Sequence, residues 1–398
     1  MHFTRYLPAA LLSLPALALD SAPTDDPFKV YTISAKGITA KLIPYGARLT
    51  SLLVPDRDGK VQDVVVGYDD PKQYVKDTET VHSYFGPVVG RYANRIANGT
   101  FTIDGHEYHI PKNEKGVSTL HGGKVGYDIR NWTVKAHTKS SITFMLEDHK
   151  WEGFPGDVDS YATFSVDAET TPENPNGLPQ LTSSLVAHAL TDPTPIMLSN
   201  HIYWNLNGFK KENVLEDTFL QLPLSKRFIG TNSALIPNGT ILEVADAYNG
   251  SPDFTIGKLV GQDIKDTEGL CGADCSGYDN CFIVDRPPQY AAVNSVVPVL
   301  RMNSSTTGIS LEVATDQQAV QIYSCNGQNG SIPIKPSQAK RNKEEGIKGA
   351  KGVNQHGCIV IETEGWIDAI NNPEWAQDQI FTPGHPAINY ATYQFGTV

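Results

Sequence analysis

Short β-prone segments separated by turn-forming residues recur along the whole chain, and no segment shows a long apolar period of 3.6 residues. Such segments are rich in the β-branched and aromatic residues that fit a pleated surface. The turns have an ample supply of 34 glycines and 26 prolines. The pattern predicts an all-β fold, with one large β-sandwich built from runs that include Ser141–Leu146, Tyr161–Val166, Leu181–Ala187, Ile309–Ala314, Ala319–Tyr323 and Gly357–Ile361.

Turn-rich segments mark the connections between these strands. Asp104-Gly105 predicts a hairpin between strands at 101–103 and 107–110. His106 and His109 lie three apart in it and therefore point to opposite faces, which argues against a shared metal ion. The stretches 171–179 and 331–351 are expected to be loops; the second carries six basic and two acidic residues between positions 335 and 351 and is predicted to be solvated.

The N-terminus has the layout of a secretory signal peptide. Residues 1–18 contain a His and an Arg, then an apolar stretch, then Ala16-Leu17-Ala18 as a cleavage site. Pro8 and Pro15 interrupt the apolar stretch, which is too short to span a bilayer, and no later segment reaches about 18 consecutive apolar residues. We expect a signal peptide at 1–18 and a single domain at 19–398, secreted, extracellular and without a membrane segment.

Sequons and cysteines agree with export. The Asn-x-Ser/Thr motif occurs at Asn98, Asn131, Asn238, Asn249, Asn303 and Asn329. Five cysteines are an odd number, so at least one thiol stays free or pairs between chains. Cys271, Cys275 and Cys281 are close enough for a local disulfide, while Cys325 and Cys358 lie further along. The spacing is not C-x-x-C and no His lies nearby, so zinc binding is a poor explanation.

The charge balance narrows the possible partners. The formal net charge of the 398 residues is −12, and no basic stripe offsets it, which argues against nucleic-acid binding. A hydrophobic content of 40% with 9% aromatic residues is too rich for a disordered chain. We expect a monomer or a weak dimer.

Common catalytic signatures are absent: there is no G-x-S-x-G, no phosphate-binding P-loop and no H-E-x-x-H. Four compact polar clusters stand out instead. They are 90–99 (GRYANRIANG), 120–123 (LHGG), 199–206 (SNHIYWNL), and 359–363 (IVIET) followed by 368–373 (DAINNP).

At these clusters the chain resembles the aldose 1-epimerase (galactose mutarotase) family. The resemblance extends through 152–156 (EGFPG), 277–279 (GYD) and 320–323 (VQIY), and it covers roughly the whole chain after the signal peptide in the expected order. It implies a galactose mutarotase-like supersandwich that interconverts the α and β anomers of free hexoses such as galactose or glucose.

Such a reaction needs one base, one acid and hydroxyl-binding groups, without a cofactor. Glu362 ends an apolar run, so partial burial is expected to raise its pKa and suit it to the base role. His201 suits the acid role, since an imidazole exchanges a proton near neutrality. Strand alternation predicts one face with His201, Tyr203 and Asn205 and an opposite face with Ile202, Trp204 and Leu206.

The resemblance assigns the same catalytic pair, Glu362 as general base and His201 as general acid. We expect these two side chains to meet across one pyranose, about one sugar ring's width apart. By resemblance the substrate-binding residues are Asn94, Arg95, His121, Tyr203, Asp279 and Gln321, with no cofactor and no metal. The chain departs from the family pattern at Met197 and at Asn280-Cys281; because the latter two flank Asp279, they are expected to shape the pocket wall and the sugar preference.

Two alternatives belong to other functional classes. A carbohydrate-binding β-sandwich without catalytic activity would keep the pocket, although a lectin needs no acid/base pair. A glycosidase would need two opposed carboxylates about 5–9.5 Å apart, and Asp279 with Glu362 is the only obvious pair. The epimerase hypothesis accounts for more of the clusters than either alternative.

Overall fold

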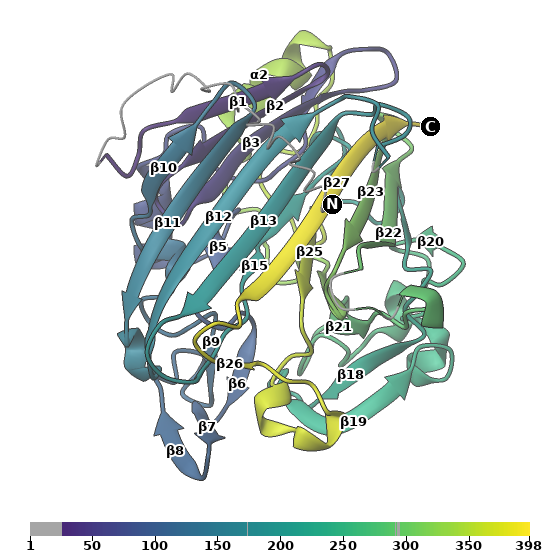
Figure 1. Cartoon of the computed structure of the whole chain (residues 1–398). Helices are drawn as coiled ribbons and strands as arrows, with labels where there is room; N and C mark the ends of the chain where they lie inside the picture. Colours follow the sequence, from purple (N-terminus) through teal and green to yellow (C-terminus); the bar gives the residue numbers. More distant parts are fainter. Residues whose placement is uncertain (1–25, 173, 291, 293–294) are drawn as a thin grey trace, which may run out of the picture.

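A nine-stranded antiparallel sheet forms one layer of the molecule (Figure 1). The computed structural model describes residues 26–398 except 173, 291, 293 and 294. The predicted signal peptide at 1–18 lies outside the described residues. In spatial order the sheet contains β10 (Thr133–His137), β11 (Ser141–His149), β12 (Asp157–Asp167), β13 (Gln180–Ala189), β27 (Ala387–Thr397), β23 (Ile309–Thr315), β22 (Val297–Ser304), β17 (Thr218–Gln221) and β20 (Lys258–Leu259).

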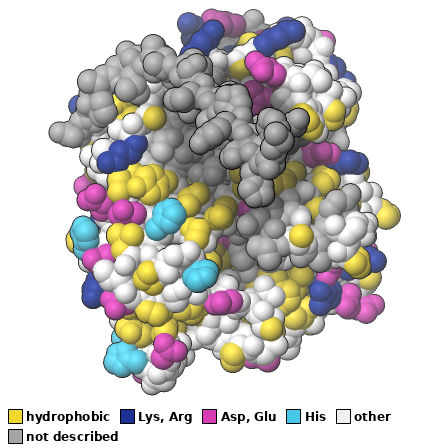
Figure 2. All heavy atoms as spheres, viewed as in Figure 1, with side chains coloured by type: hydrophobic (Ala, Val, Ile, Leu, Met, Phe, Trp, Pro, Cys, Tyr) yellow, Lys and Arg dark blue, Asp and Glu magenta, His cyan; other side chains and the backbone are white. Residues whose placement is uncertain are grey.

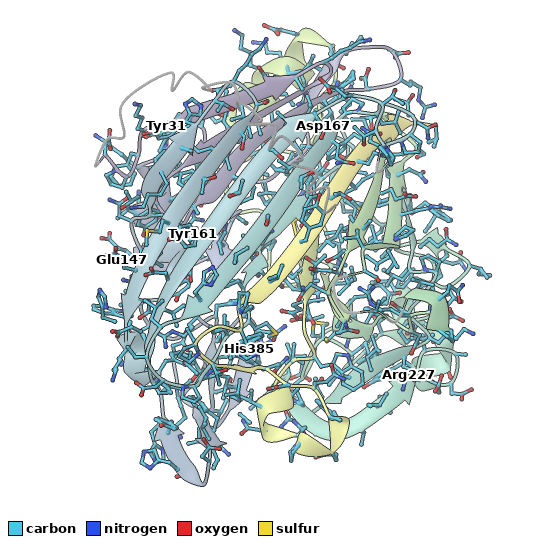
Figure 3. All side chains as sticks on the ribbon, viewed as in Figure 1. Tyr31, Glu147, Tyr161, Asp167, Arg227 and His385 are labelled. Carbon is cyan, nitrogen blue, oxygen red and sulfur yellow. A yellow bond between two sulfur atoms is a disulfide. The ribbon has the colours of Figure 1, made fainter. Side chains whose placement is uncertain are left out.

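The long strands of this sheet bury one face and leave the other partly accessible to solvent. Along β12 buried and half-buried residues alternate strictly, as expected when one face of a sheet covers a core. Tyr161, on the half-buried side of β12, is labelled in Figure 3. In the same view, Figure 2 shows apolar and histidine side chains exposed among acidic and basic ones.

A six-stranded antiparallel sheet forms the layer that carries the polar clusters. Its core-facing side chains pack on the nine-stranded sheet: the Trp204 ring lies 5.2 Å from that of Tyr393 and 5.9 Å from that of Phe395, centroid to centroid. The predicted all-β sandwich is confirmed. In spatial order the strands are β16 (Ile202–Trp204), β25 (Ile359–Glu364), β24 (Ala319–Tyr323), β21 (Asp279–Ile283), β18 (Arg227–Thr231) and β19 (Pro237–Glu243).

Smaller sheets complete the fold. A four-stranded sheet contains β1 (Tyr31–Ala35), β2 (Ile38–Ile43), β3 (Arg48–Pro55) and β4 (Val61–Asp63). Four two-stranded pairs are β5 (Val88–Val89) with β15 (Ser199–Asn200), β6 (Arg95–Ala97) with β9 (Ser118–Leu120), β7 (Thr100–Ile103) with β8 (His106–His109), and β14 (Thr194–Pro195) with β26 (Ile380–Phe381). The β7–β8 pair is the predicted hairpin. No helix of the described part is long and apolar enough to cross a membrane.

The described residues form two short α-helices, α1 (Gln73–Thr80) and α2 (Pro336–Glu344). Helix α2 corrects the prediction of a solvated loop at 331–351. Lys335, just before α2, is buried, and its Nζ lies 3.0 Å from a carboxylate oxygen of Asp63. Gln338 and Asn342 bury their amides against backbone carbonyls. Part of the basic stretch is therefore buried, because its polar groups bond to buried groups from distant parts of the chain.

Two disulfides form among the five cysteines. Cys271 pairs with Cys275, a local bridge of the predicted kind, and Cys325 pairs with Cys358 across the connection from β24 to β25. Cys281 is free and buried, which agrees with the odd count.

Candidate active site

One wall of a pocket is formed by four adjacent strands of the six-stranded sheet, β16, β25, β24 and β21. Alternation sends Ile202 and Trp204, Ile359 and Ile361, and Val320 and Ile322 into the main core. The residues between them face the other way. The pocket-lining side chains from this sheet and its edges are His201, Tyr203, Glu362, Gln321, Tyr323 and Asp279.

The opposite wall comes from three segments outside that sheet. They supply Tyr84, the pair Asn94 and Arg95 at the start of β6, and Leu120 and His121 at the end of β9. The β6–β9 ladder pairs Arg95 with Leu120, so the two polar clusters of the sequence lie side by side. The volume of this open pocket is about 190 Å³.

Three residues of this second wall have a strained backbone conformation. Tyr84, Asn94 and His121 all adopt left-handed φ angles, at 53°, 56° and 50°. A non-glycine residue in this region costs about 1–3 kcal/mol and persists only where its surroundings enforce it. The main-chain N–H of His121 donates to the carbonyl of Asn94, and the main-chain N–H of Asn94 donates to the His121 ring. This reciprocal pair holds both side chains in the pocket.

The predicted acid and base are in direct contact. Nε2 of His201 lies 3.6 Å from Oε1 of Glu362. The expected separation of one sugar ring is therefore wrong: the two groups converge on one point. Convergence on one point suits the ring opening predicted from the sequence, because the anomeric hydroxyl and the ring oxygen of a pyranose are bonded to the same carbon.

Burial controls the ionisation of both groups. It lowers the pKa of His201 to about 3, so the ring is neutral near pH 7 in the free protein. Burial, followed by repulsion from Glu364 and Asp279, raises the pKa of Glu362 well above its ordinary value, while Arg95 opposes the rise. Glu362 is almost fully buried, which is more than the partial burial predicted from the sequence. However, it does not end its strand, since β25 continues to Glu364.

His121 is a hydrogen-bond donor toward the pocket. Its Nδ1 accepts the main-chain N–H of Asn94 at 3.1 Å, and burial lowers its pKa well below the ordinary value. The neutral ring therefore carries its hydrogen on Nε2. Ligand atoms of His121, His201 and Glu362 lie within 4.8 Å of one another, close enough for a metal ion. A hydrogen on Nε2 of His121 removes the lone pair that a metal would need, so this donor set does not fit one.

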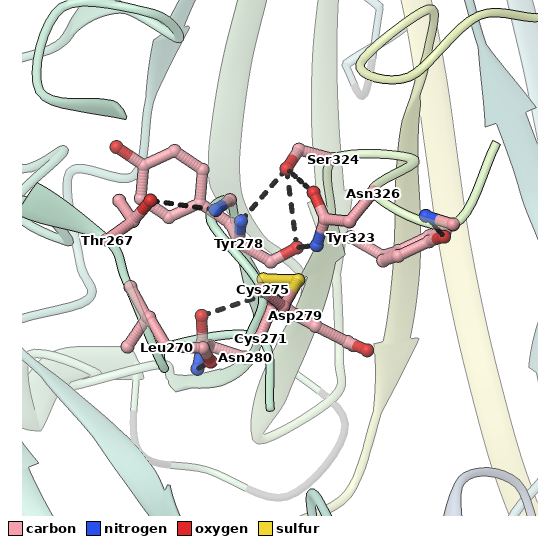
Figure 4. The surroundings of a disulfide bond; sticks show 12 residues. Thr267, Leu270, Cys271, Cys275, Tyr278, Asp279, Asn280, Tyr323, Ser324 and Asn326 are labelled. Atoms are coloured by element: carbon pink, nitrogen blue, oxygen red, sulfur yellow. Dashed lines mark hydrogen bonds between the residues drawn. A yellow bond between two sulfur atoms is a disulfide. The ribbon is translucent and has the colours of Figure 1, made fainter. Parts of the chain in front are cut away.

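Asp279 is positioned by its neighbours on the sheet and by a disulfide-closed loop (Figure 4). Nε2 of Gln321 donates to its Oδ1 at 2.6 Å, and burial raises the Asp279 pKa. The adjacent Asn280 donates to the carbonyl of Leu270, which precedes the Cys271–Cys275 bridge. Asn280 and Cys281 do not line the pocket, so the expectation that they shape its wall is wrong; both are buried behind it.

All eight residues singled out from the sequence line this one pocket; they are Asn94, Arg95, His121, His201, Tyr203, Asp279, Gln321 and Glu362. Asn205, expected on the same face as His201, instead bonds the carbonyl of Gly357 and the main-chain N–H of Phe209 beyond the end of β16. Sequence reasoning missed Tyr84, Leu120 and Tyr323 as lining residues. The Tyr84 ring lies 4.8 Å from that of His121 and 5.8 Å from that of His201.

Two carboxyl groups, two neutral imidazoles and further polar side chains meet in one open pocket of this β-sandwich, a set of groups that suits a small polar molecule. The aldose 1-epimerase family matches residues 29–387. A "Probable aldose 1-epimerase" of Arthroderma benhamiae is 58% identical over 388 residues, covering 95% of this chain and 88% of the relative. The chain belongs to the aldose 1-epimerase family and is an isomerase.

More distant relatives agree with this assignment. The galactose mutarotase of Mus musculus is 29% identical over 369 residues, covering 91% of this chain and 92% of that protein. Among solved structures, a GalM/aldose epimerase homologue from C. elegans superimposes with a TM-score of 0.77 at 28% identity, covering 93% of this chain and 99% of the other. The galactose mutarotase-like fold predicted from the resemblance is confirmed.

Proposed function

We propose that the protein is a secreted aldose 1-epimerase that interconverts the α and β anomers of free hexoses such as galactose and glucose by acid/base ring opening. The observation that carries this proposal is the contact between His201 and Glu362 inside a pocket of polar, buried groups. Ring opening requires a proton to leave the anomeric hydroxyl and a proton to reach the ring oxygen. Two groups that converge on one carbon can serve both oxygens.

The protons taken up and released in the reaction balance when Glu362 and His201 act as one unit. Glu362 and His201 together hold one proton, and the reactive arrangement has Glu362 ionised and His201 protonated. Glu362 takes the proton of the anomeric hydroxyl, His201 gives its proton to the ring oxygen, and the bond between the anomeric carbon and that oxygen breaks. After rotation about the bond between carbons 1 and 2, the reverse transfers close the ring and restore the pair.

The other lining groups bind the sugar. The Nε2–H of His121 donates to a sugar oxygen, and the Arg95 guanidinium binds hydroxyls while favouring the ionised form of Glu362. Asp279, fixed by Gln321, accepts hydroxyl hydrogens, since a carboxylate offers several lone pairs. Burial in a small pocket strengthens each of these interactions.

Polarimetry on freshly dissolved α-galactose and α-glucose tests the proposal. The native protein should speed the decay of optical rotation, and Glu362→Gln should lower kcat by about 10²–10⁴-fold, because an amide cannot accept the proton. Glu312→Gln on the exposed side of β23 is the matched control and should retain full activity. Wild-type turnover by Glu362→Gln would rule out the base assignment. Sugar binding without any acceleration by the native protein would favour the lectin alternative.

Secretion is supported by three features of the chain. The sequence begins with the signal-peptide pattern at 1–18, and four cysteines form disulfides, which persist in oxidising compartments. The asparagines of five sequons are exposed and that of the sixth, Asn303, is partly so. Attachment of a glycan requires such exposure, so the positions of the sequons are compatible with export.

A further inference from the structure

Two carboxyl side chains of β25 lie on the same face of the strand, and the reaction proposed above uses only one. Glu362 and Glu364 alternate with Ile361, which packs in the core, and Thr363, whose hydroxyl bonds Asn389 on β27. Their Cα atoms are therefore about 7 Å apart along the strand. Both side chains are almost completely buried. A second buried carboxyl this close to Glu362 must affect the ionisation of Glu362.

Glu364 reaches the pocket only through a neighbouring side chain. Nδ2 of Asn94 donates to Oε1 of Glu364 at 3.1 Å, while Oδ1 of Asn94 accepts from the main-chain N–H of Arg95 at 3.0 Å. Asn94 and Arg95 line the pocket and Glu364 does not. The second oxygen of Glu364 is buried and has no partner in the described part of the chain. The carboxyl thus fixes the Asn94 amide beside the sugar-binding guanidinium.

The groups that face Glu362 and Glu364 are mostly neutral or acidic. Both imidazoles are neutral, so the buried carboxyls of Glu362 and Glu364 and the half-buried carboxyl of Asp279 share the Arg95 guanidinium. Since Asn94 donates to Glu364 and no described group donates to Glu362, Glu364 ionises first. Its charge then opposes loss of the proton from Glu362. The facing groups are Arg95 at the start of β6, Asp279 and Cys281 on β21, His201 and Tyr203 at β16, His121 after β9, Tyr92 before β6, and Tyr393 on β27.

We propose that Glu364 is a positioning residue: it fixes Asn94 beside Arg95, and its carboxylate makes Glu362 a stronger base, which keeps the shared proton on the Glu362–His201 pair. The inference rests on the proposed function, because only ring opening requires that proton. The ionisation behaviour of both groups agrees with it. Burial raises the pKa of Glu364 to about 8, and burial together with repulsion from Glu364 raises the pKa of Glu362 well above its ordinary value.

The sign of the expected effect follows from the proton count. The Glu362–His201 pair is active while it holds one proton, and kcat falls as pH rises through the Glu362 pKa. Replacing Glu364 by Gln removes the neighbouring charge but keeps an oxygen that accepts from Asn94. At about 7 Å and an effective dielectric constant of about 20, this lowers the alkaline midpoint of kcat by one to two pH units. KM should stay within about twofold, because the Asn94 contact survives.

The experiment records pH profiles of kcat and KM for the native protein, Glu364→Gln, Glu364→Asp and Glu312→Gln. Glu364→Asp keeps a carboxylate and should restore the native midpoint, and the exposed Glu312→Gln should leave it unchanged. Glu364→Ala loses the acceptor for Asn94 and should raise KM as well. A native midpoint in folded Glu364→Gln overturns the proposal, since a merely structural Glu364 would lower stability without moving the profile.

A spectroscopic titration separates this proposal from the proposed function. Carboxyl ¹³C NMR of the glutamate-labelled native protein, with the Glu362 signal assigned from Glu362→Gln, should show two coupled steps. The Glu362 step should move down by one to two pH units in Glu364→Gln. If that shift occurs in a protein without epimerase activity, the coupling stands and the proposed function fails. Independent single-step titration of Glu362 in the native protein overturns the proposal even if Glu364→Gln does not fold.

Discussion

The Cys325–Cys358 disulfide should be the most stabilising covalent restraint in the described structure. It joins the end of β24 to the start of β25, the strands that carry Gln321 and Glu362, and closes a loop of 33 residues that includes α2. Cross-linking a loop of this length removes about 12 cal/mol/K of entropy from the unfolded chain, or about 3.7 kcal/mol at 25 °C. Cys325→Ala/Cys358→Ala should lose about that much unfolding free energy.

The second disulfide provides an internal comparison. Cys271 and Cys275 are only four residues apart, so the same relation gives about 1.9 kcal/mol for Cys271→Ala/Cys275→Ala. Guanidinium unfolding followed by tryptophan fluorescence measures both losses, with midpoints compared at constant slope. Because both partners are replaced together, neither variant leaves a new thiol to pair with the buried Cys281.

The ranking of the two variants is the decisive result. If Cys271→Ala/Cys275→Ala loses as much free energy as Cys325→Ala/Cys358→Ala, loop closure is not the source of the stabilisation. The activity of the Cys325→Ala/Cys358→Ala variant at 25 °C should stay near the native level, because β24 and β25 also pair through five residue pairs from Ala319–Glu364 to Tyr323–Val360. A loss of kcat without unfolding would show that the bridge also sets the position of Glu362.

Two further predictions concern stability and compartment. Asp148→Asn should lower the free energy of unfolding by about 3–5 kcal/mol in thermal or guanidinium unfolding. The Arg91 guanidinium lies 2.8 Å from Asp148 and is 1% exposed, so this variant leaves it as an unpaired buried charge. Glu312→Gln breaks an exposed pair with Arg301 and should lower the free energy of unfolding by less than about 1 kcal/mol. Mass spectrometry of protein from the culture medium should find an N-terminus after Ala18 and a glycan on exposed sequons such as Asn238; an intact Met1 terminus without glycans would contradict secretion.

Much of the fold could be predicted from the sequence, because these features depend on residues that are close together in the chain. Alternation around Ile202 and Trp204 placed these residues in the core and left Tyr203 facing the pocket. The Asp104-Gly105 turn correctly indicated the hairpin of β7 and β8. The apolar run before Glu362 correctly indicated a buried carboxyl. In each case neighbours in sequence supply the physical cause.

Features that depend on distant partners could not be predicted in this way. Lys335 looked like a solvated charge because its partner, Asp63, lies 272 residues away. Tyr84 enters the pocket from an irregular segment and has a left-handed φ angle, and no residue pattern around it marks that conformation. Asn205 continued the alternation in sequence, but β16 ends at Trp204 and the side chain serves the following turn.

The acid/base assignment shows how geometry changes a chemical interpretation. From the sequence, His201 was expected to be an acid because its ordinary pKa lies near neutrality. Burial moves its pKa far below that range while it raises that of Glu362, so neither residue acts alone as the sequence suggested. Because Nε2 of His201 and Oε1 of Glu362 lie 3.6 Å apart, the two residues can share one proton and act together. In the proposed reaction, one proton shared by these two groups serves both oxygens of the anomeric carbon. Glu364 keeps that proton on the pair and Arg95 favours the ionised form of Glu362, so the balance between these two charges matters as much as the pair itself.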